Sequence, residues 1–179
     1  MRIITGKYGG RRFPVPPTFK ARPTTDFAKE NIFNVLRARV DFETTHALDL
    51  FAGTGAITLE LLSRGCPLVV SVEKDRRHFR FIADIIRQLG DTSARPICAD
   101  ALHYINHCTE QFDLVFADPP YALPELPELP ERILSGKTLV PGGLLLLEHG
   151  RTNDFSSHPA FIEHRAYGSV NFSFFRKPE

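Results

Sequence analysis

From His46 onward, short apolar runs alternate with helical stretches, and this alternation limits the fold more than any other feature. The apolar runs cover residues 46–51, 68–73, 94–98, 112–117 and 143–148, and helical patterns fit 55–64, 75–89, 100–108 and 126–138. Strands that are apolar at consecutive positions are buried on both faces, as in a parallel sheet covered by helices on both sides. The sequence therefore predicts an α/β fold with a mostly parallel, doubly wound sheet.

The two ends of the chain depart from this pattern. Residues 2–13 place glycine-rich turn residues between short apolar segments, which predicts a small β-hairpin. A helix then begins after Thr24 or Thr25, either of which can cap it, and runs to about residue 40. The final residues predict an antiparallel hairpin around Tyr167, Gly168 and Ser169. We accordingly divide the chain into an extension of residues 1–40 and a sheet domain of residues 41–179.

Charge is distributed unevenly along the chain. Residues 1–30 hold seven basic and two acidic side chains, a net charge of +5, whereas the whole chain carries only +1. This asymmetry predicts an electropositive arm on a slightly acidic body, which suits a polyanionic partner.

Several protein classes are disfavoured. No apolar run approaches the ~20 residues of a membrane helix, and the first residues lack the apolar stretch of a signal peptide. We expect a cytoplasmic protein that does not act at a membrane. The three cysteines include no CxxC pair and the seven histidines show no metal-binding spacing, so no metal site is expected.

A glycine-rich turn, DLFAGTG at Asp49–Gly55, follows the first apolar run. Nucleotide-like cofactors bind at this turn in doubly wound sheets. The dinucleotide fingerprint needs a third glycine where this chain has Thr58, which weakens a nicotinamide cofactor. The carboxylate of Asp49 would repel phosphates but favour the amino group and sulfonium of S-adenosylmethionine.

Acidic residues also end the next two apolar runs. Glu73 can accept hydrogen bonds from both ribose hydroxyls of a bound cofactor. Asp100 can accept from an adenine amino group, with the Ala101 amide facing the ring, or can simply cap a helix. The predicted cofactor-binding residues are Asp49, Phe51, Gly53, Gly55, Glu73, Lys74, Asp100, Ala101 and Asp118.

The fourth apolar run ends as FDLVFADPPY, and the predicted catalytic residues are Asp118, Pro119, Pro120 and Tyr121. Two prolines fix the backbone and remove two amide donors, so that their carbonyls and the Asp118 carboxylate are expected to accept from an exocyclic amino group. Tyr121 can stack on the base that carries this group. The first and fourth strands are neighbours in the usual doubly wound order, so this corner should lie beside the glycine turn.

These motifs resemble those of S-adenosylmethionine-dependent amino-methyltransferases of nucleic acids, with the signature D/N-P-P-Y/F/W. Nearly the whole chain is similar to the bacterial 16S ribosomal RNA guanine-N2 methyltransferase family (the RsmD type). The similar blocks are MRIITGKYGGRRF, RPTTDFAKENIFNVL, DLFAGTGAITLELLSRG, VEKDR, FDLVFADPPY and GGLLLLEH.

The resemblance implies a class I methyltransferase (Rossmann-like) domain at residues 41–179. It also implies that residues 1–40 form an RNA-binding arm, and that the substrate is one guanine of 16S RNA in the small (30S) subunit or an assembly intermediate. The implied RNA-binding residues are Arg2, Lys7, Arg11, Arg12, Arg22, Thr24 and Thr25. Two alternatives stay open: methylation of adenine N6 or cytosine N4 in DNA, and a non-catalytic RNA-binding factor in ribosome assembly.

Overall fold

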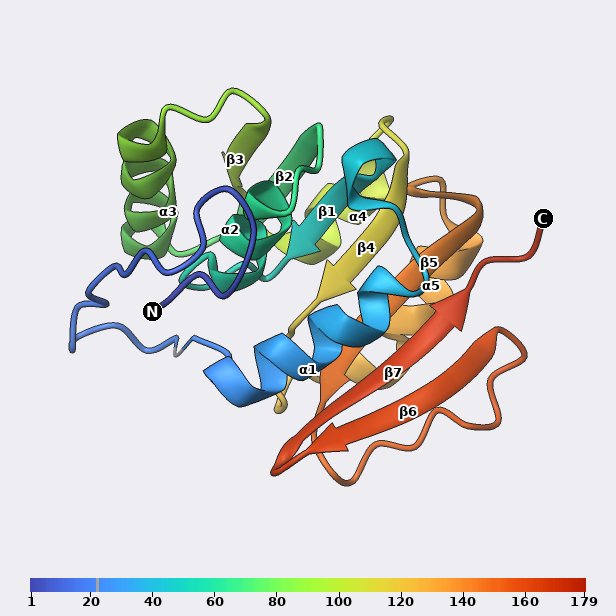
Figure 1. Cartoon of the computed structure of the whole chain (residues 1–179). Helices are drawn as coiled ribbons and strands as arrows, with labels where there is room; N and C mark the ends of the chain where they lie inside the picture. The colour runs from blue at the N-terminus through green and yellow to red at the C-terminus, as the bar shows by residue number, and fades with distance from the viewer. Residues whose placement is uncertain (22) are drawn as a thin grey trace.

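A seven-stranded sheet organises the computed structural model, which describes residues 1–21 and 23–179 (Figure 1). The strand order is β3-β2-β1-β4-β5-β7-β6, with β1 (His46–Leu50) at the centre of the parallel part. The other parallel strands are β2 (Leu68–Glu73), β3 (Ala94–Cys98), β4 (Phe112–Ala117) and β5 (Leu139–His149). The antiparallel edge is formed by β6 (Phe161–Tyr167) and β7 (Val170–Arg176). The predicted doubly wound sheet and C-terminal hairpin are confirmed.

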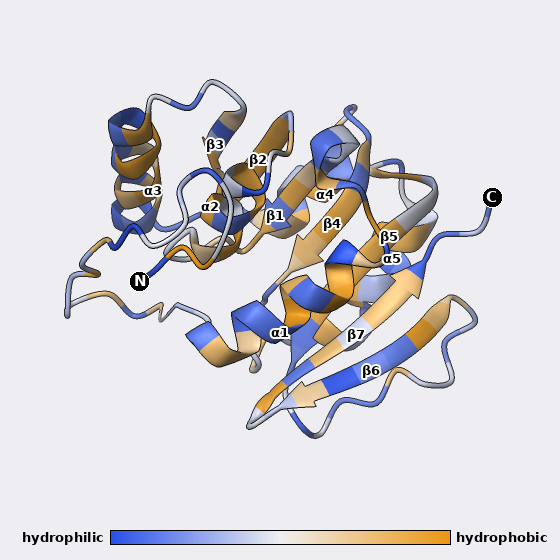
Figure 2. Cartoon of the chain, in the orientation of Figure 1, coloured by the Kyte–Doolittle hydropathy of each residue, from blue (hydrophilic) through white to orange (hydrophobic). Residues whose placement is uncertain are grey.

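Helices cover both faces of the sheet. On one face lie α1 (Asp26–Arg37), α2 (Ala56–Ser63) and α3 (Arg76–Leu89), and on the other lie α4 (Ala101–His107) and α5 (Leu129–Ser135). The central strands are strongly hydrophobic, whereas β6 carries a polar middle section (Figure 2). Residues that alternate along β4 pack into two separate core clusters, because successive side chains of a strand point to opposite faces. Within the described residues, no helix is both long and apolar enough to cross a bilayer.

The single helix expected over residues 126–138 is wrong. The segment forms a short 3-10 helix, η2 (Leu126–Glu128), followed by α5, and β5 already begins at Leu139. Pro127 and Pro130 lack amide donors and each sits in the first turn of one of these two helices. Gly136 follows α5 in an extended conformation. A second 3-10 helix, η1 (Phe42–Thr44), leads into β1.

The N-terminal segment is bound to the body of the protein rather than held away from it. Its hairpin contains a single antiparallel bridge, between Arg2 and Arg12, and its backbone contacts the end of α2 through the Ser63 carbonyl, which accepts from the Lys7 amide at 2.8 Å. Glu60, fully buried on α2, accepts hydrogen bonds from the amides of Ile4 and Thr5. The extension therefore has a fixed position relative to α2 and the turn that precedes it.

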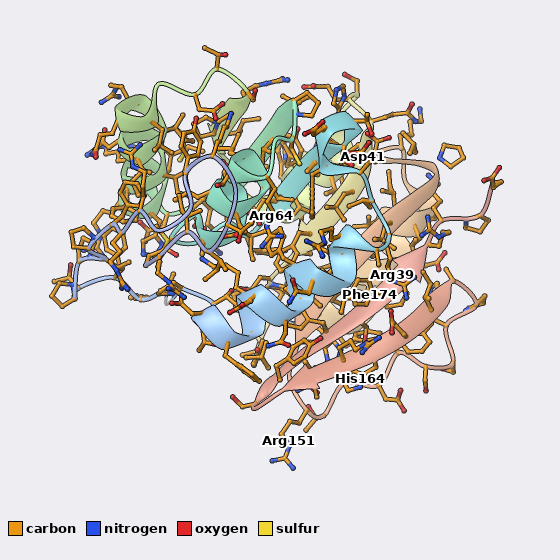
Figure 3. The ribbon with its side chains drawn as sticks, viewed as in Figure 1. Arg39, Asp41, Arg64, Arg151, His164 and Phe174 are labelled. Atoms are coloured by element: carbon orange, nitrogen blue, oxygen red, sulfur yellow. The ribbon has the colours of Figure 1, made fainter. Side chains whose placement is uncertain are left out.

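Helix α1 is part of the same core as the sheet. Ile32 and Phe33 are completely buried in one cluster with residues of β4, β5 and β7. Beyond its end, Arg39 lies over the ring of Phe174 at 5.3 Å and forms an ion pair with Glu163 (Figure 3). Residues 1–40 thus share their hydrophobic core with the rest of the chain.

Candidate active site

A cavity of about 530 Å³ opens at the carboxyl ends of the parallel strands, the edge at which ligands bind in this fold class. Four of its lining residues lie at the carboxyl ends of neighbouring strands: Glu73 ends β2, Phe51 follows β1, Asp118 follows β4, and Glu148 is the penultimate residue of β5. The register explains this placement, because Val72, Leu50, Ala117 and Leu147 pair across the sheet one position earlier. The sheet therefore delivers these four residues to one row at the edge of the cavity.

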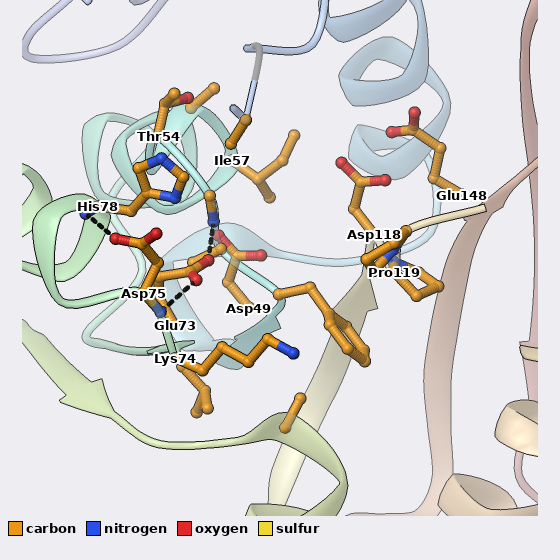
Figure 4. A pocket seen from close by; sticks show the side chains of 18 of the residues that line it. Asp49, Thr54, Ile57, Glu73, Lys74, Asp75, His78, Asp118, Pro119 and Glu148 are labelled. Atoms are coloured by element: carbon orange, nitrogen blue, oxygen red, sulfur yellow. Dashed lines mark hydrogen bonds between the residues drawn. The ribbon is translucent and has the colours of Figure 1, made fainter. Parts of the chain in front are cut away.

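The glycine turn forms one wall of this cavity. Phe51 and Gly53 both have positive φ angles, 59° and 58°, and the Gly53 amide donates to Glu73 Oε2 at 2.7 Å. The other oxygen of Glu73 accepts from the Asp75 amide at 2.9 Å (Figure 4). Phe51 is the sole non-glycine with positive φ among the described residues, and such backbone strain is concentrated at functional sites. Glu73 thus fixes the shape of the turn through both carboxylate oxygens while it lines the cavity.

Gly55 and Asp100 lie outside the cavity lining, although both were predicted to bind the cofactor. Gly55 caps α2 with a φ of 81°, and an added Cβ would lie 2.9 Å from Cγ1 of Ile82, so this glycine permits α2 and α3 to pack closely. Asp100 is exposed and caps α4 by accepting from the His103 amide at 3.0 Å. The predicted Lys74 and Ala101 do line the cavity.

Asp49 is buried beneath the cavity and is held by a residue that the sequence analysis treated only as a missing glycine. Its Oδ2 accepts from both the amide (3.0 Å) and the hydroxyl (2.7 Å) of Thr58 on α2. Burial raises the pKa of Asp49 to about 7, although the two Thr58 hydrogen bonds oppose that shift. A carboxyl held in this way becomes ionised most readily when a cation binds nearby.

The acid–proline corner lies directly across the cavity from the glycine turn (Figure 4). Asp118, Pro119, Pro120 and Tyr121 all line the cavity, so the predicted neighbourhood of the first and fourth strands is confirmed. One detail was wrong: the Pro120 carbonyl already accepts from the Leu123 amide at 2.9 Å and closes a turn. The acceptors that remain available at this corner are the Pro119 carbonyl and the Asp118 carboxyl.

Tyr121 and Glu148 form a pair that the sequence analysis did not foresee. The Tyr121 hydroxyl donates to Glu148 Oε1 at 2.9 Å, while the ring remains half-exposed at the cavity mouth. Glu148 is buried, and burial raises its pKa to about 7. The available signal was its place as the only charged residue at the end of an apolar run, the same signal that identified Glu73 and Asp118.

Burial, together with the nearby charges of Glu148 and Asp49, raises the pKa of Asp118 well above its usual range. The cavity thus gathers three carboxyls that hold their protons more tightly than in water. Two cationic side chains, Lys20 and Lys74, also line it. A ligand that brings positive charge and hydrogen-bond donors to these carboxyls would relieve their mutual repulsion.

A pH dependence of stability follows for Asp49. Its pKa is near 4 in the unfolded chain and about 7 in the folded protein, so folding loses free energy as pH rises across this interval. We expect Asp49→Asn to remove about 2 kcal/mol of this loss between pH 5 and pH 7. Thermal melting of the wild type and of Asp49→Asn at several pH values measures the difference in their stability. Burial lowers the pKa of His149, which therefore contributes a pH dependence of opposite sign. This contribution is the same in both proteins and cancels in the comparison.

The exposed substitution Asp84→Asn serves as the control for that comparison and should follow the wild type at every pH. A stability difference between wild type and Asp49→Asn that stays constant from pH 5 to pH 8 would contradict the assignment of a raised pKa to Asp49.

The predicted RNA-binding residues lie on the N-terminal segment, with varied surroundings. Arg2 pairs with Asp26 at 3.0 Å, and Lys7 pairs with Asp91 at 3.1 Å. Arg11 and Arg12 are exposed, and Arg22 lies outside the described residues. Of the two threonines, Thr24 lines the cavity and Thr25 caps α1. The segment therefore reaches the cavity through Lys20, Ala21, Pro23 and Thr24.

Across the described residues, no group of three or more His, Cys, Asp and Glu side chains is arranged to hold a metal ion.

Comparisons with known proteins agree with this geometry. Residues 1–176 match the family model described as Conserved hypothetical protein 95. The protein named ribosomal RNA small subunit methyltransferase D from Escherichia coli (strain K12) is 31% identical over 160 residues, which span 89% of this chain and 80% of that protein.

Two solved structures share the fold over almost their full lengths. Hypothetical protein TTHA0928 of Thermus thermophilus is 31% identical, with a TM-score of 0.84 and coverage of 98% of each chain. The Escherichia coli protein yhhF, a candidate methyltransferase, is 29% identical, with a TM-score of 0.86 and coverage of 99% of this chain and 98% of that one.

Proposed function

This chain belongs to the family described as Conserved hypothetical protein 95, and from that premise we propose that it transfers a methyl group from S-adenosylmethionine to the exocyclic N2 of one guanine in 16S ribosomal RNA. The observation that carries the proposal is that the glycine turn and the acid–proline corner line one cavity. A ribosomal RNA substrate would place the protein in the cytoplasm, acting on the small subunit or an assembly intermediate.

The residues around the glycine turn suit the cofactor. Gly53 has no side chain to obstruct a ligand, and Glu73 keeps lone pairs available for two ribose hydroxyls. Asp49 places a buried carboxyl where the amino group or sulfonium of the cofactor would offset its charge. When bound, S-adenosylmethionine supplies an electrophilic methyl group on a positively charged sulfur.

The acid–proline corner suits the acceptor amine. The Asp118 carboxylate and the Pro119 carbonyl can accept the two hydrogens of an exocyclic amino group, which directs the nitrogen lone pair away from the ring plane. Asp118 then takes the proton that the nitrogen loses after methylation, and its raised pKa suits it to this role. The half-exposed ring of Tyr121 can stack on the base, which contributes about 1–3 kcal/mol.

The N-terminal segment suits a polyanionic substrate such as RNA. It carries a net charge of +5 over residues 1–30 and is fixed to α2 by backbone hydrogen bonds, so exposed Arg11 and Arg12 keep a set position relative to the cavity. Such residues can hold phosphates of a single-stranded segment while one base enters the cavity.

Methyl transfer to defined substrates tests the proposal. Labelled S-adenosylmethionine is incubated with the protein and, in parallel, with hypomethylated small-subunit particles, naked 16S RNA and duplex DNA, and the nucleosides are then analysed by mass spectrometry. We expect N2-methylguanosine from RNA or particles and no product from DNA. Product from DNA alone would establish the alternative DNA methyltransferase, and cofactor binding without any product would favour the non-catalytic RNA-binding factor.

A further inference from the structure

Glu148 has a buried oxygen atom that no group among residues 1–21 and 23–179 satisfies. Its Oε1 accepts from the Tyr121 hydroxyl, whereas Oε2 is buried without a hydrogen-bond partner among the described residues. The side chain as a whole is 6% exposed and lines the cavity. A buried carboxylate oxygen without a donor is costly, so a site that retains one is suited to a ligand that supplies the donor.

The position of this oxygen relative to Asp118 follows from the sheet. Ala117 of β4 pairs with Leu147 of β5 in parallel register, so Asp118 and Glu148 are the next residues along two neighbouring strands. Neighbouring strands lie ~4.8 Å apart, and residues at equivalent positions face the same side. Figure 4 accordingly shows the two carboxyls extending in the same direction beyond Pro119.

The strand order also separates this pair from the cofactor side of the cavity. Glu73 ends β2 and the glycine turn follows β1, whereas Asp118 and Glu148 lie at β4 and β5, on the other side of β1. Glu148 is the more distant of the two carboxyls from the glycine turn in that order. A base whose amine is held at Asp118 would therefore present its adjacent ring atom to Glu148.

The hydrogen-bonding groups at the edges of the bases distinguish guanine from adenine and cytosine at such a pair of carboxyls. Guanine is the base whose exocyclic amine lies next to a ring N–H, because its N2 amino group adjoins N1–H. In adenine and cytosine the ring nitrogen next to the amine is an acceptor, which a carboxylate would repel. Two adjacent carboxylates thus match the N1–H and N2–H donors of guanine and mismatch the other amino-bearing bases.

We infer that Glu148 selects guanine by accepting a hydrogen bond from N1–H through Oε2 while Asp118 holds the N2 amine. This inference rests on the proposed function and names its specificity-determining residue. Tyr121 fixes the Glu148 carboxyl through Oε1, which leaves Oε2 for the base. An ionised carboxyl is the stronger acceptor, and a cationic cofactor beside Asp118 together with two base donors would favour that state of Glu148.

The test compares guanine with 2-aminopurine at the target position of the small-subunit RNA. Both bases carry the 2-amino group, but N1 of 2-aminopurine is an acceptor. We expect wild type to methylate guanine with a kcat/KM about 30-fold higher than 2-aminopurine, the value of one good base contact. Glu148→Gln presents an amide that can donate to that N1, so the preference should fall to near unity or invert.

Tyr121→Phe is the matched control, because it removes the hydroxyl contact to Glu148 but keeps the carboxyl. It should lower kcat on both bases and change the guanine preference by less than about threefold, since the preference comes from Oε2. Cofactor affinity and thermal melting of Glu148→Gln report whether that variant is folded.

The possible results distinguish a failure of the proposed function from a failure of the inference about Glu148. If wild type methylates no guanine, the proposed function fails. If wild type methylates guanine but treats 2-aminopurine equally well, or if Glu148→Gln keeps the full preference of the wild type, then the proposed function stands and the inference about Glu148 is overturned. The wild-type comparison requires no variant, so it decides even if Glu148→Gln does not fold.

Discussion

Replacing Asp118 by alanine is expected to lower kcat for methyl transfer by about 1000-fold, because it removes the acceptor that orients the amine and takes its proton. The cofactor dissociation constant should change little, since Glu73 and the glycine turn form the cofactor side of the cavity. Single-turnover transfer at saturating cofactor and RNA measures the first quantity, and calorimetry measures the second.

Two further variants sharpen that test. Asp118→Asn keeps one acceptor oxygen without the charge, so we expect it to retain activity above the alanine variant by about tenfold. Asp84→Ala removes an exposed carboxyl paired with Arg87 on α3 and should leave both quantities unchanged. Turnover of Asp118→Ala within a few-fold of the wild type would remove Asp118 from the mechanism.

Replacing Glu73 by alanine is expected to weaken cofactor binding by about 100-fold, the combined effect of losing two hydrogen bonds to a charged acceptor. The same substitution leaves the amides of Gly53 and Asp75 without their partner, which loosens the turn. Calorimetric titration with S-adenosylmethionine and with its demethylated product measures the loss, which should be similar for both because they share the same ribose.

The control for Glu73 is Glu128→Gln, an exposed carboxyl paired with Arg132 far along the chain from the turn. It should bind the cofactor as the wild type does. At saturating cofactor, Glu73→Ala should recover most of the wild-type kcat, because the amine is held at Asp118. Unchanged affinity in Glu73→Ala would place the ribose elsewhere and would contradict the assignment of the glycine turn as the cofactor site.

The strands that hold the site were predictable because they are buried on both faces and therefore form nearly continuous apolar runs in the sequence. The strands predicted at 68–73 and 112–117 have the observed bounds, and both runs are buried on two faces. Glu73 ends the first run, Asp118 directly follows the second, and both acids line the cavity. Parallel order and the carboxyl-end rule then brought Glu73, Gly53 and Asp118 together without any knowledge of contacts.

The remaining features depend on which individual groups contact one another, and a sequence pattern does not encode these contacts. Thr58 on α2 holds Asp49, which lies nine residues earlier on β1, and Tyr121 holds Glu148 across 27 residues. The Pro120 carbonyl is engaged in a local turn, and Arg2 is paired with Asp26. Composition identified the charges on these residues, but only their tertiary partners show which of them remain available to a ligand.

Mass mapping of ribosomal RNA from cells that lack this protein tests the central claim most directly. The account predicts that one guanine of the small-subunit RNA loses a single N2 methyl group, and that wild-type protein restores it whereas Asp118→Ala does not. Ribosomal RNA with unchanged guanine methylation in those cells would contradict the account.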